Sequence, residues 1–179
     1  MTTPTRARRD YAPLIHAARA FMVATPAADR AARMKQALDL LFDAFGSDGL
    51  IAPGSDKGIS WIGFYEKSAG DEMILLERRD KPACSPIGLF GACGRGWREQ
   101  RSLVIPDIRS LGAGYIACDP RDRSEVVVPC FDAAGTCWGV LDGDSHDLAG
   151  FDEHDASELE SLLRTLGLTF GPPAAIARV

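Results

Sequence analysis

The sequence lacks any long apolar run. No stretch of about 18 consecutive apolar residues occurs among its 179 residues, so no segment has the composition of a membrane-spanning helix. The first segment, residues 1–21, also lacks the unbroken apolar core that a secretory signal needs. We therefore expect a cytoplasmic protein that does not engage a membrane.

The chain also lacks an excess of basic residues. It carries 20 Lys and Arg against 25 Asp and Glu, which gives a net charge of −5 at pH 7. Proteins that bind nucleic acid contact its phosphates with clustered Lys and Arg, so we expect no nucleic-acid partner. The basic cluster at residues 6–9 lies in a segment that we expect to be a solvated tail.

Length and composition indicate one folded unit. A chain with 46% hydrophobic and 25% charged residues is typical of a globular protein rather than a disordered one, and 179 residues suffice for one domain with a sizeable core. No internal repeat is visible. We expect a flexible N-terminal tail over 1–10, a single domain over 11–170 and a C-terminal tail over 171–179.

The five cysteines lack the short CxxC spacing of structural zinc sites. Nor do the histidines, at positions 16, 146 and 154, form a ligand pattern with them. In a reducing compartment such cysteines stay as thiols. Redox chemistry needs only a nucleophilic thiolate and a second thiol that can reach it. The cysteines therefore favour thiol chemistry over a zinc site or a disulfide scaffold.

Hydrophobic periodicity predicts helices at both ends of the chain and strands between them. Apolar residues recur at helical spacing over 11–23, 26–45 and 152–169. We expect Thr25 to cap the second helix, with Pro26 at its first position, and Asp152 to cap the third. β-rich runs bounded by turn residues predict strands at 59–67, 72–79, 102–107, 125–131 and 137–144. This order predicts an α+β domain with a mainly antiparallel sheet flanked by the terminal helices.

Three cysteines lie in polar or glycine-rich segments. Cys84 and Cys93 fall in segments rich in Gly and Pro, which are typical of mobile loops. Cys118 precedes a charged run in which Arg121 and Arg123 are close enough in sequence to favour a thiolate. The two remaining cysteines, at 130 and 137, fall inside apolar strands, and we expect them to be small buried core residues.

Carboxylates gather near the end of the last predicted strand. Asp142 and Asp144 are two residues apart and so point to the same face, and Glu125 begins a strand that is expected to lie beside theirs. Close like charges can keep one carboxyl protonated, or together they can bind an ammonium group. Turn formation by the two aspartates and a solvated Glu125 are the alternatives.

Trp61 and Tyr65 are expected to share one face of the first strand, with Gly63 between them. Aromatic side chains that flank a glycine can form one wall of a small-molecule pocket. Ordinary core packing is the alternative.

Several short motifs, taken in order, resemble those of the free methionine-(R)-sulfoxide reductases, which are enzymes built on a GAF domain. The motifs are "SWIGFYE", "KPAC", "GACG", "GYIACD", "RSEVVVP", "GVLDGDS" and "FDEHDASELE", and the resemblance covers about residues 30–165. It implies a GAF-like fold and an enzyme that acts on the free amino acid and not on sulfoxide within proteins. The preference for the R form comes with the resemblance alone.

The resemblance implies roles for the three loop cysteines. Cys118 would attack the sulfoxide sulfur and become a sulfenic acid as methionine departs. Cys84 would resolve that sulfenic acid as a disulfide, with Cys93 as an additional thiol. Thioredoxin would be the reductant, and neither a metal nor an organic cofactor is required.

The resemblance also implies roles for the other candidate residues. Glu125, Asp142 and Asp144 would supply a proton or bind the substrate ammonium, while Trp61 and Tyr65 would pack around its methyl and thioether groups.

The chain also departs from the family pattern. The loop between Cys84 and Cys93 is one residue shorter than usual, and Gly114-Tyr115 replaces the family's Gly-His. A GAF module that binds a small ligand, or senses redox state without catalysis, is the alternative function. A homodimer paired through the N-terminal helices is possible, although these helices could equally cover one face of the sheet.

Overall fold

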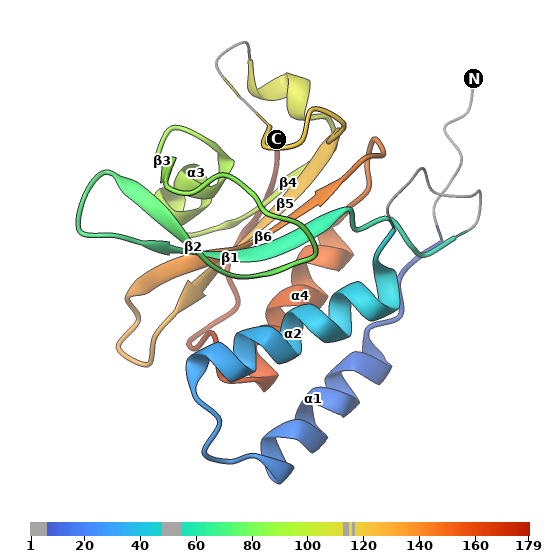
Figure 1. Cartoon of the computed structure of the whole chain (residues 1–179), viewed down its shortest axis with the longest axis vertical. Coiled ribbons are helices and arrows are strands. Elements are labelled where there is room, and N and C mark those ends of the chain that lie inside the picture. The colour runs from blue at the N-terminus through green and yellow to red at the C-terminus, as the bar shows by residue number, and fades with distance from the viewer. Residues whose placement is uncertain (1–6, 48–54, 113–114, 116) are drawn as a thin grey trace.

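One curved sheet forms the centre of the protein in the computed structural model, which describes residues 7–47, 55–112, 115 and 117–179 (Figure 1). Within these residues seven strands lie in the order β3-β2-β1-β6-β5-β4-β7. Their bounds are β1 Trp61–Lys67, β2 Glu72–Arg79, β3 Ile87–Gly88, β4 Ser102–Ile105, β5 Ser124–Phe131, β6 Cys137–Ser145 and β7 Ile176–Arg178. Neighbouring strands are antiparallel except β4 and β7, which are parallel. The α+β prediction with a mainly antiparallel sheet is confirmed.

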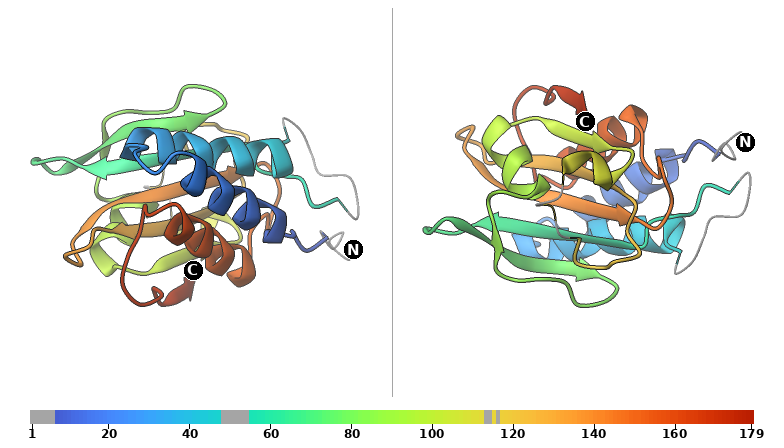
Figure 2. Two further views of the ribbon diagram at one scale, coloured as in Figure 1. Left: turned by 90° about the horizontal axis from the view of Figure 1, so that it is seen from below. Right: turned by 90° about the horizontal axis from the view of Figure 1, so that it is seen from above.

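Helices cover the two faces of the sheet unequally. The helices α1 (Ala12–Ala24), α2 (Arg30–Phe45) and α4 (Glu153–Thr165) lie over one face, and α3 (Ala92–Glu99) and the 3₁₀ helix η1 (Ile108–Leu111) lie over the other (Figure 2). Side chains alternate accordingly, because successive residues of a strand point to opposite faces. Ile62 and Phe64 of β1 pack under the first group of helices, whereas Trp61 and Tyr65 face α3. The N-terminal helices therefore cover the sheet.

The second helix begins later than the sequence predicted. Its N-cap is Asp29, whose carboxylate accepts a hydrogen bond from the Ala32 N–H. Thr25 instead ends α1, since both its N–H and its hydroxyl donate to the Phe21 carbonyl. An ionised carboxylate at the N-cap also faces the positive end of the helix dipole, so α2 starts at Arg30 and not at Pro26.

The last helix is capped as predicted but is shorter. Asp152 accepts from the Asp155 N–H, and the Asp155 side chain accepts from the Asp152 N–H, which makes a reciprocal capping box. The helix ends at Thr165 and not at residue 169, because Gly167 takes a positive φ of 65° that breaks the helical path.

Both expected tails contribute to the fold in their described parts. Arg9 is 1% exposed, and its guanidinium lies 3.2 Å from Asp155 and over the Phe151 ring. The prediction of a solvated tail was therefore wrong for Arg9, because a buried carboxylate at the start of α4 needs a cationic partner. Arg8 and Asp10 are exposed, and residues 1–6 lie outside the described part. At the other end β7 pairs with β4 and satisfies an edge that would otherwise be open. No helix in the described ranges is long and apolar enough to cross a membrane.

Candidate functional site

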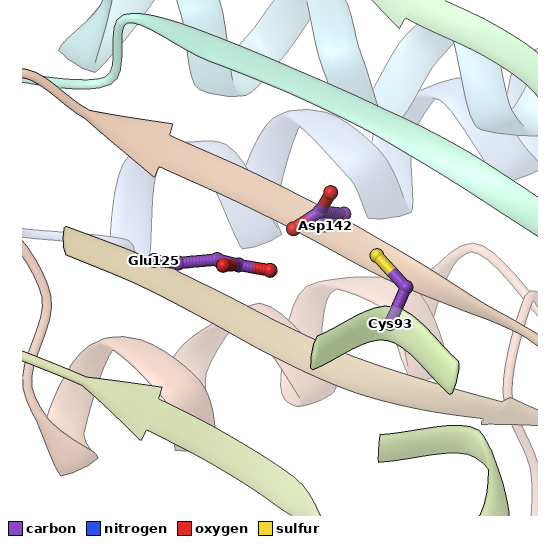
Figure 3. Close-up of side chains that lie close together, drawn as sticks. All are labelled: Cys93, Glu125 and Asp142. Carbon is purple, nitrogen blue, oxygen red and sulfur yellow. The ribbon is translucent and has the colours of Figure 1, made fainter. Parts of the chain in front are cut away.

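Three adjacent strands place the predicted carboxylates side by side. In the register of the sheet, Asp144 on β6 stands opposite Trp61 on β1 and opposite Glu125 on β5. Asp142 lies two residues earlier on β6, on the same face as Asp144. This is the face that α3 covers, and Figure 3 shows Glu125 and Asp142 on neighbouring strands beneath Cys93.

All the candidate site residues border one cavity of about 240 Å³. It is enclosed by β1, β5 and β6 below, by α3 at one side, and by the segments that carry the two exposed cysteines. Among the residues that line it are Trp61, Tyr65, Cys84, Cys93, Cys118, Glu125, Asp142 and Asp144. The fold thus brings together residues that are up to 83 positions apart in the sequence.

The two aromatic residues form one wall of this cavity. Trp61 and Tyr65 are 3% and 1% exposed, and their ring centroids are 6.1 Å apart. A Cβ at Gly63 would lie 2.5 Å from Cη2 of Trp61, so the glycine leaves space for the indole to lie against the strand. The Tyr65 hydroxyl donates to the Cys84 carbonyl and the Trp61 indole N–H donates to the Lys81 carbonyl, so both rings hold the segment that carries Cys84.

The carboxyl groups share a water-poor environment. Burial raises the pKa of Asp142 to about 6, although hydrogen bonds with Cys93 and Glu125 oppose the rise. Burial, followed by the charge of Asp142, raises the pKa of both Glu125 and Asp144 well above the ordinary range. The group therefore retains at least one proton near neutral pH and can either donate it or hold a cation.

Tyr115 is a cavity residue that the sequence analysis did not include among the candidates. Its hydroxyl donates a short hydrogen bond to Glu125 Oε2, and this bond lowers the pKa of the carboxyl against the effect of burial. The sequence feature that could have identified Tyr115 as a site residue was the replacement of His by Tyr in the "GYIACD" motif. The flanking residues 113, 114 and 116 lie outside the described part.

Cys93 does not lie in a mobile loop, as its glycine-rich surroundings had indicated. It is the second residue of α3 and is 5% exposed. The neighbouring glycines serve close packing: a Cβ at Gly96 would lie 2.7 Å from Cγ1 of Val127, and one at Gly94 would clash with the Leu89 backbone. Burial and the nearby charge of Asp142 raise the pKa of Cys93 well above its usual value. Because the ligand atoms of Cys93, Glu125 and Asp142 lie within 4.8 Å of one another, they could also hold a cation.

Cys84 and Cys118 are exposed thiols in contact with each other. Their side chains are within hydrogen-bonding distance, although they belong to segments 34 residues apart. The shortened loop between Cys84 and Cys93 therefore still allows Cys84 to reach Cys118. An ion pair joins the same two segments, since Lys81 Nζ lies 2.6 Å from Asp119 Oδ2.

The expected activation of Cys118 by arginine is wrong. Partial burial of the sulfur and the adjacent Cys84 thiol raise the pKa of Cys118 to about 12. Arg121 is instead paired with Asp119 at 2.8 Å, because a carboxylate one residue after the thiol is the stronger partner for a guanidinium. In this state Cys118 is a protonated thiol. The buried positions expected for the cysteines at 130 and 137 are confirmed.

Comparisons with known proteins find similar GAF-domain proteins, and free methionine-R-sulfoxide reductases are among them. No family model matches the chain. The GAF domain-containing protein A of Dictyostelium discoideum is 36% identical over 107 residues, which are 59% of this chain and 66% of that protein. The free methionine-R-sulfoxide reductase of Saccharomyces cerevisiae is 37% identical over 111 residues, which are 60% of this chain and 61% of that protein. The matched segment thus spans less than two thirds of these curated relatives.

Solved structures match over almost the whole chain. The reduced form of fRMsr of Staphylococcus aureus is 30% identical with a TM-score of 0.76, and the match covers 93% of this chain and 97% of that one. The free methionine-R-sulfoxide reductase of Neisseria meningitidis, solved in complex with its substrate, is 32% identical with a TM-score of 0.71 and coverages of 93% and 94%.

Proposed function

Because the chain belongs to the family of free methionine-R-sulfoxide reductases, which have the GAF fold, we propose that it reduces free methionine-(R)-sulfoxide to methionine. The observation that carries the proposal is the single cavity in which the Cys84 and Cys118 thiols adjoin buried, partly protonated carboxyls. Its volume of about 240 Å³ is sufficient for a free amino acid.

The carboxyl cluster can hold the substrate by its ammonium group. Glu125, Asp142 and Asp144 offer negative charge in a cavity where Glu125 and Asp142 are buried, and burial strengthens ion pairing. Trp61 and Tyr65 then lie where the sulfur and methyl group of the substrate can contact aromatic rings. This orientation directs the sulfoxide towards Cys118.

The first chemical step transfers oxygen from the substrate to Cys118. The sulfur of Cys118 attacks the sulfoxide sulfur to form a transient S–S bond, and a cavity carboxyl protonates the sulfoxide oxygen. The substrate S–O bond and the S–S bond then break as the oxygen bonds to the Cys118 sulfur. The sulfoxide is reduced by two electrons to the thioether of methionine, and Cys118 is oxidised by two electrons to a sulfenic acid. Since Cys118 is protonated in the free protein, its proton must pass to a base as it attacks.

The second step closes a disulfide. The Cys84 thiol attacks the sulfenic sulfur of Cys118, the Cys84–Cys118 bond forms, and the sulfenic oxygen leaves as water. A dithiol reductant, for which we propose thioredoxin, then reduces the disulfide to two thiols and is itself oxidised. We place this cycle in the cytoplasm, where such reductants keep protein thiols reduced.

The decisive experiment is an anaerobic assay with free methionine-R- and methionine-S-sulfoxide and a dithiol reductant. We expect the wild type to release methionine from the R form and Cys118→Ser to be inactive, while Cys137→Ser, which changes a thiol outside the cavity, stays active. Turnover that survives Cys118→Ser would contradict the proposal. Binding of the sulfoxide and disulfide formation under oxidant, without any turnover, would instead identify a redox-sensing GAF module.

A further inference from the structure

A second polar cluster lies beside Cys118 and is made of residues that do not line the first cavity. Asp119 and Asp122 follow Cys118 in the chain, and His146 directly follows β6. The His146 Nε2 atom lies 3.6 Å from Asp119 Oδ2 and 3.6 Å from Asp122 Oδ1, and all three ligand atoms are within 4.8 Å of one another. Both aspartates border a second cavity of about 280 Å³, which Cys118 also lines.

His146 is left unsatisfied in this cluster. The side chain is 6% exposed, yet its Nε2 has no hydrogen-bond partner within the described residues. A separation of 3.6 Å is too long for a hydrogen bond, and a buried polar atom without a partner costs about 1–3 kcal/mol. The nitrogen nevertheless lies at equal distances from two carboxylate oxygens, an arrangement that leaves room for an ion between the three atoms.

The spacing of these atoms suits a tetrahedral metal ion. Two ligands that each lie about 2.0–2.2 Å from such an ion are roughly 3.3–3.6 Å apart, which agrees with the two distances from Nε2. One imidazole nitrogen and two carboxylate oxygens form a donor set that zinc and similar divalent ions accept. We propose that Asp119, Asp122 and His146 bind a divalent cation of the zinc class.

Lys81 already occupies one side of this site. Its Nζ lies 2.6 Å from Asp119 Oδ2, the oxygen that faces His146, and Arg121 lies 2.8 Å from the same oxygen. Asp122 has Ser60 as a hydroxyl donor at 3.1 Å, and its pKa is raised by burial. An incoming cation must therefore compete with Lys81 and Arg121 for this oxygen, and we expect it to displace Lys81, which acts as a competitor built into the protein.

The position of the site gives it a consequence for the thiols. An ion held by Asp119 lies one residue from Cys118, and the displacement of Lys81 would break the ion pair between the Cys84 and Cys118 segments. The proposal itself does not depend on the reductase activity, because it concerns binding of a metal alone.

The test is a calorimetric titration with Co²⁺ of reduced protein that carries Cys93→Ser, which removes a thiol from the other group of possible ligands. We expect one ion per chain. In this background Asp122→Asn and His146→Gln should each weaken binding about tenfold or more, whereas Lys81→Met should tighten it several-fold. Asp71→Asn and His16→Gln, both exposed, are the matched controls and should leave binding unchanged.

The outcomes separate clearly. Absence of saturable binding, or binding that both Asp122→Asn and His146→Gln retain, overturns the site. Binding that Lys81→Met fails to tighten removes Asp119 from the ligands and overturns the three-residue site. Circular dichroism monitors folding, and if Asp122→Asn is unfolded, His146→Gln and Lys81→Met decide the question.

Discussion

At the scale of single residues, Cys84 and Cys93 differ in what surrounds their sulfur atoms. Cys84 is exposed and contacts Cys118, whereas Cys93 is buried against Asp142, with a raised pKa. We expect Cys84→Ser to release about one methionine per chain in a single turnover and to lose thioredoxin-dependent turnover, because no disulfide can form at Cys118. Quantification of methionine after rapid mixing, with and without thioredoxin, measures both.

Cys93→Ser is the matched variant for this experiment. It should keep thioredoxin-dependent turnover, because its thiol is directed at the carboxyl cluster and not at Cys118. Full recycling in Cys84→Ser together with its loss in Cys93→Ser would reverse the assignment and make Cys93 the resolving thiol.

At the scale of elements, α3 holds Cys93 in place by close packing on the sheet. Gly94→Ala should lower the free energy of unfolding by about 1–3 kcal/mol, because the added Cβ clashes with the Leu89 backbone and no side-chain rotation relieves it. Gly91→Ala, at the N-cap of α3 where a Cβ meets nothing within 4 Å, should change it by about 0.5 kcal/mol or less, because the poorer N-cap preference of Ala is offset by the lower entropy of its unfolded chain. Urea unfolding of both variants measures the difference, and equal losses would show that the backbone contact is unimportant.

The same helix marks where prediction from sequence ended. The strands at 72–79 and 137–144 were predictable because they are β-rich runs bounded by turn residues. Helix α3 was not, because Gly94 and Gly96 indicate flexibility when read locally, whereas their actual role depends on contacts with Leu89 and Val127.

One part of the candidate site could likewise be predicted from the sequence, and another part could not. Asp142 and Asp144 could be placed on one face from their spacing alone. The cluster around His146 could not, because it depends on how the segment after Cys118 folds back against the end of β6.

At the scale of the whole molecule, the two faces of the sheet have different energetic roles. The face under α1, α2 and α4 buries an almost wholly apolar core, which stabilises the fold. The opposite face places three carboxyl groups within one cavity, two of them buried and Asp144 partly buried, which costs stability whenever they ionise. Replacement of these carboxyl groups by uncharged side chains should therefore make the folded protein more stable.

The pH dependence of stability tests whether the carboxyl groups in the cavity destabilise the folded protein when they ionise. Burial and Asp142 raise the pKa of Asp144 in the folded state far above its ordinary value of 3.8. Above about pH 4 the unfolded chain has therefore released a proton that the folded chain retains, so this group's contribution to stability falls as the pH rises.

Asp144→Asn removes this titrating carboxyl group. We expect it to unfold at a higher temperature than the wild type at pH 8, with a smaller difference at pH 5, while its kcat/KM for the sulfoxide falls. Thermal unfolding between pH 5 and pH 8 measures the effect, with the exposed Asp71→Asn as the control. If the unfolding temperatures of Asp144→Asn and the wild type changed with pH in parallel, the carboxyl cluster would not destabilise the folded protein as its burial implies.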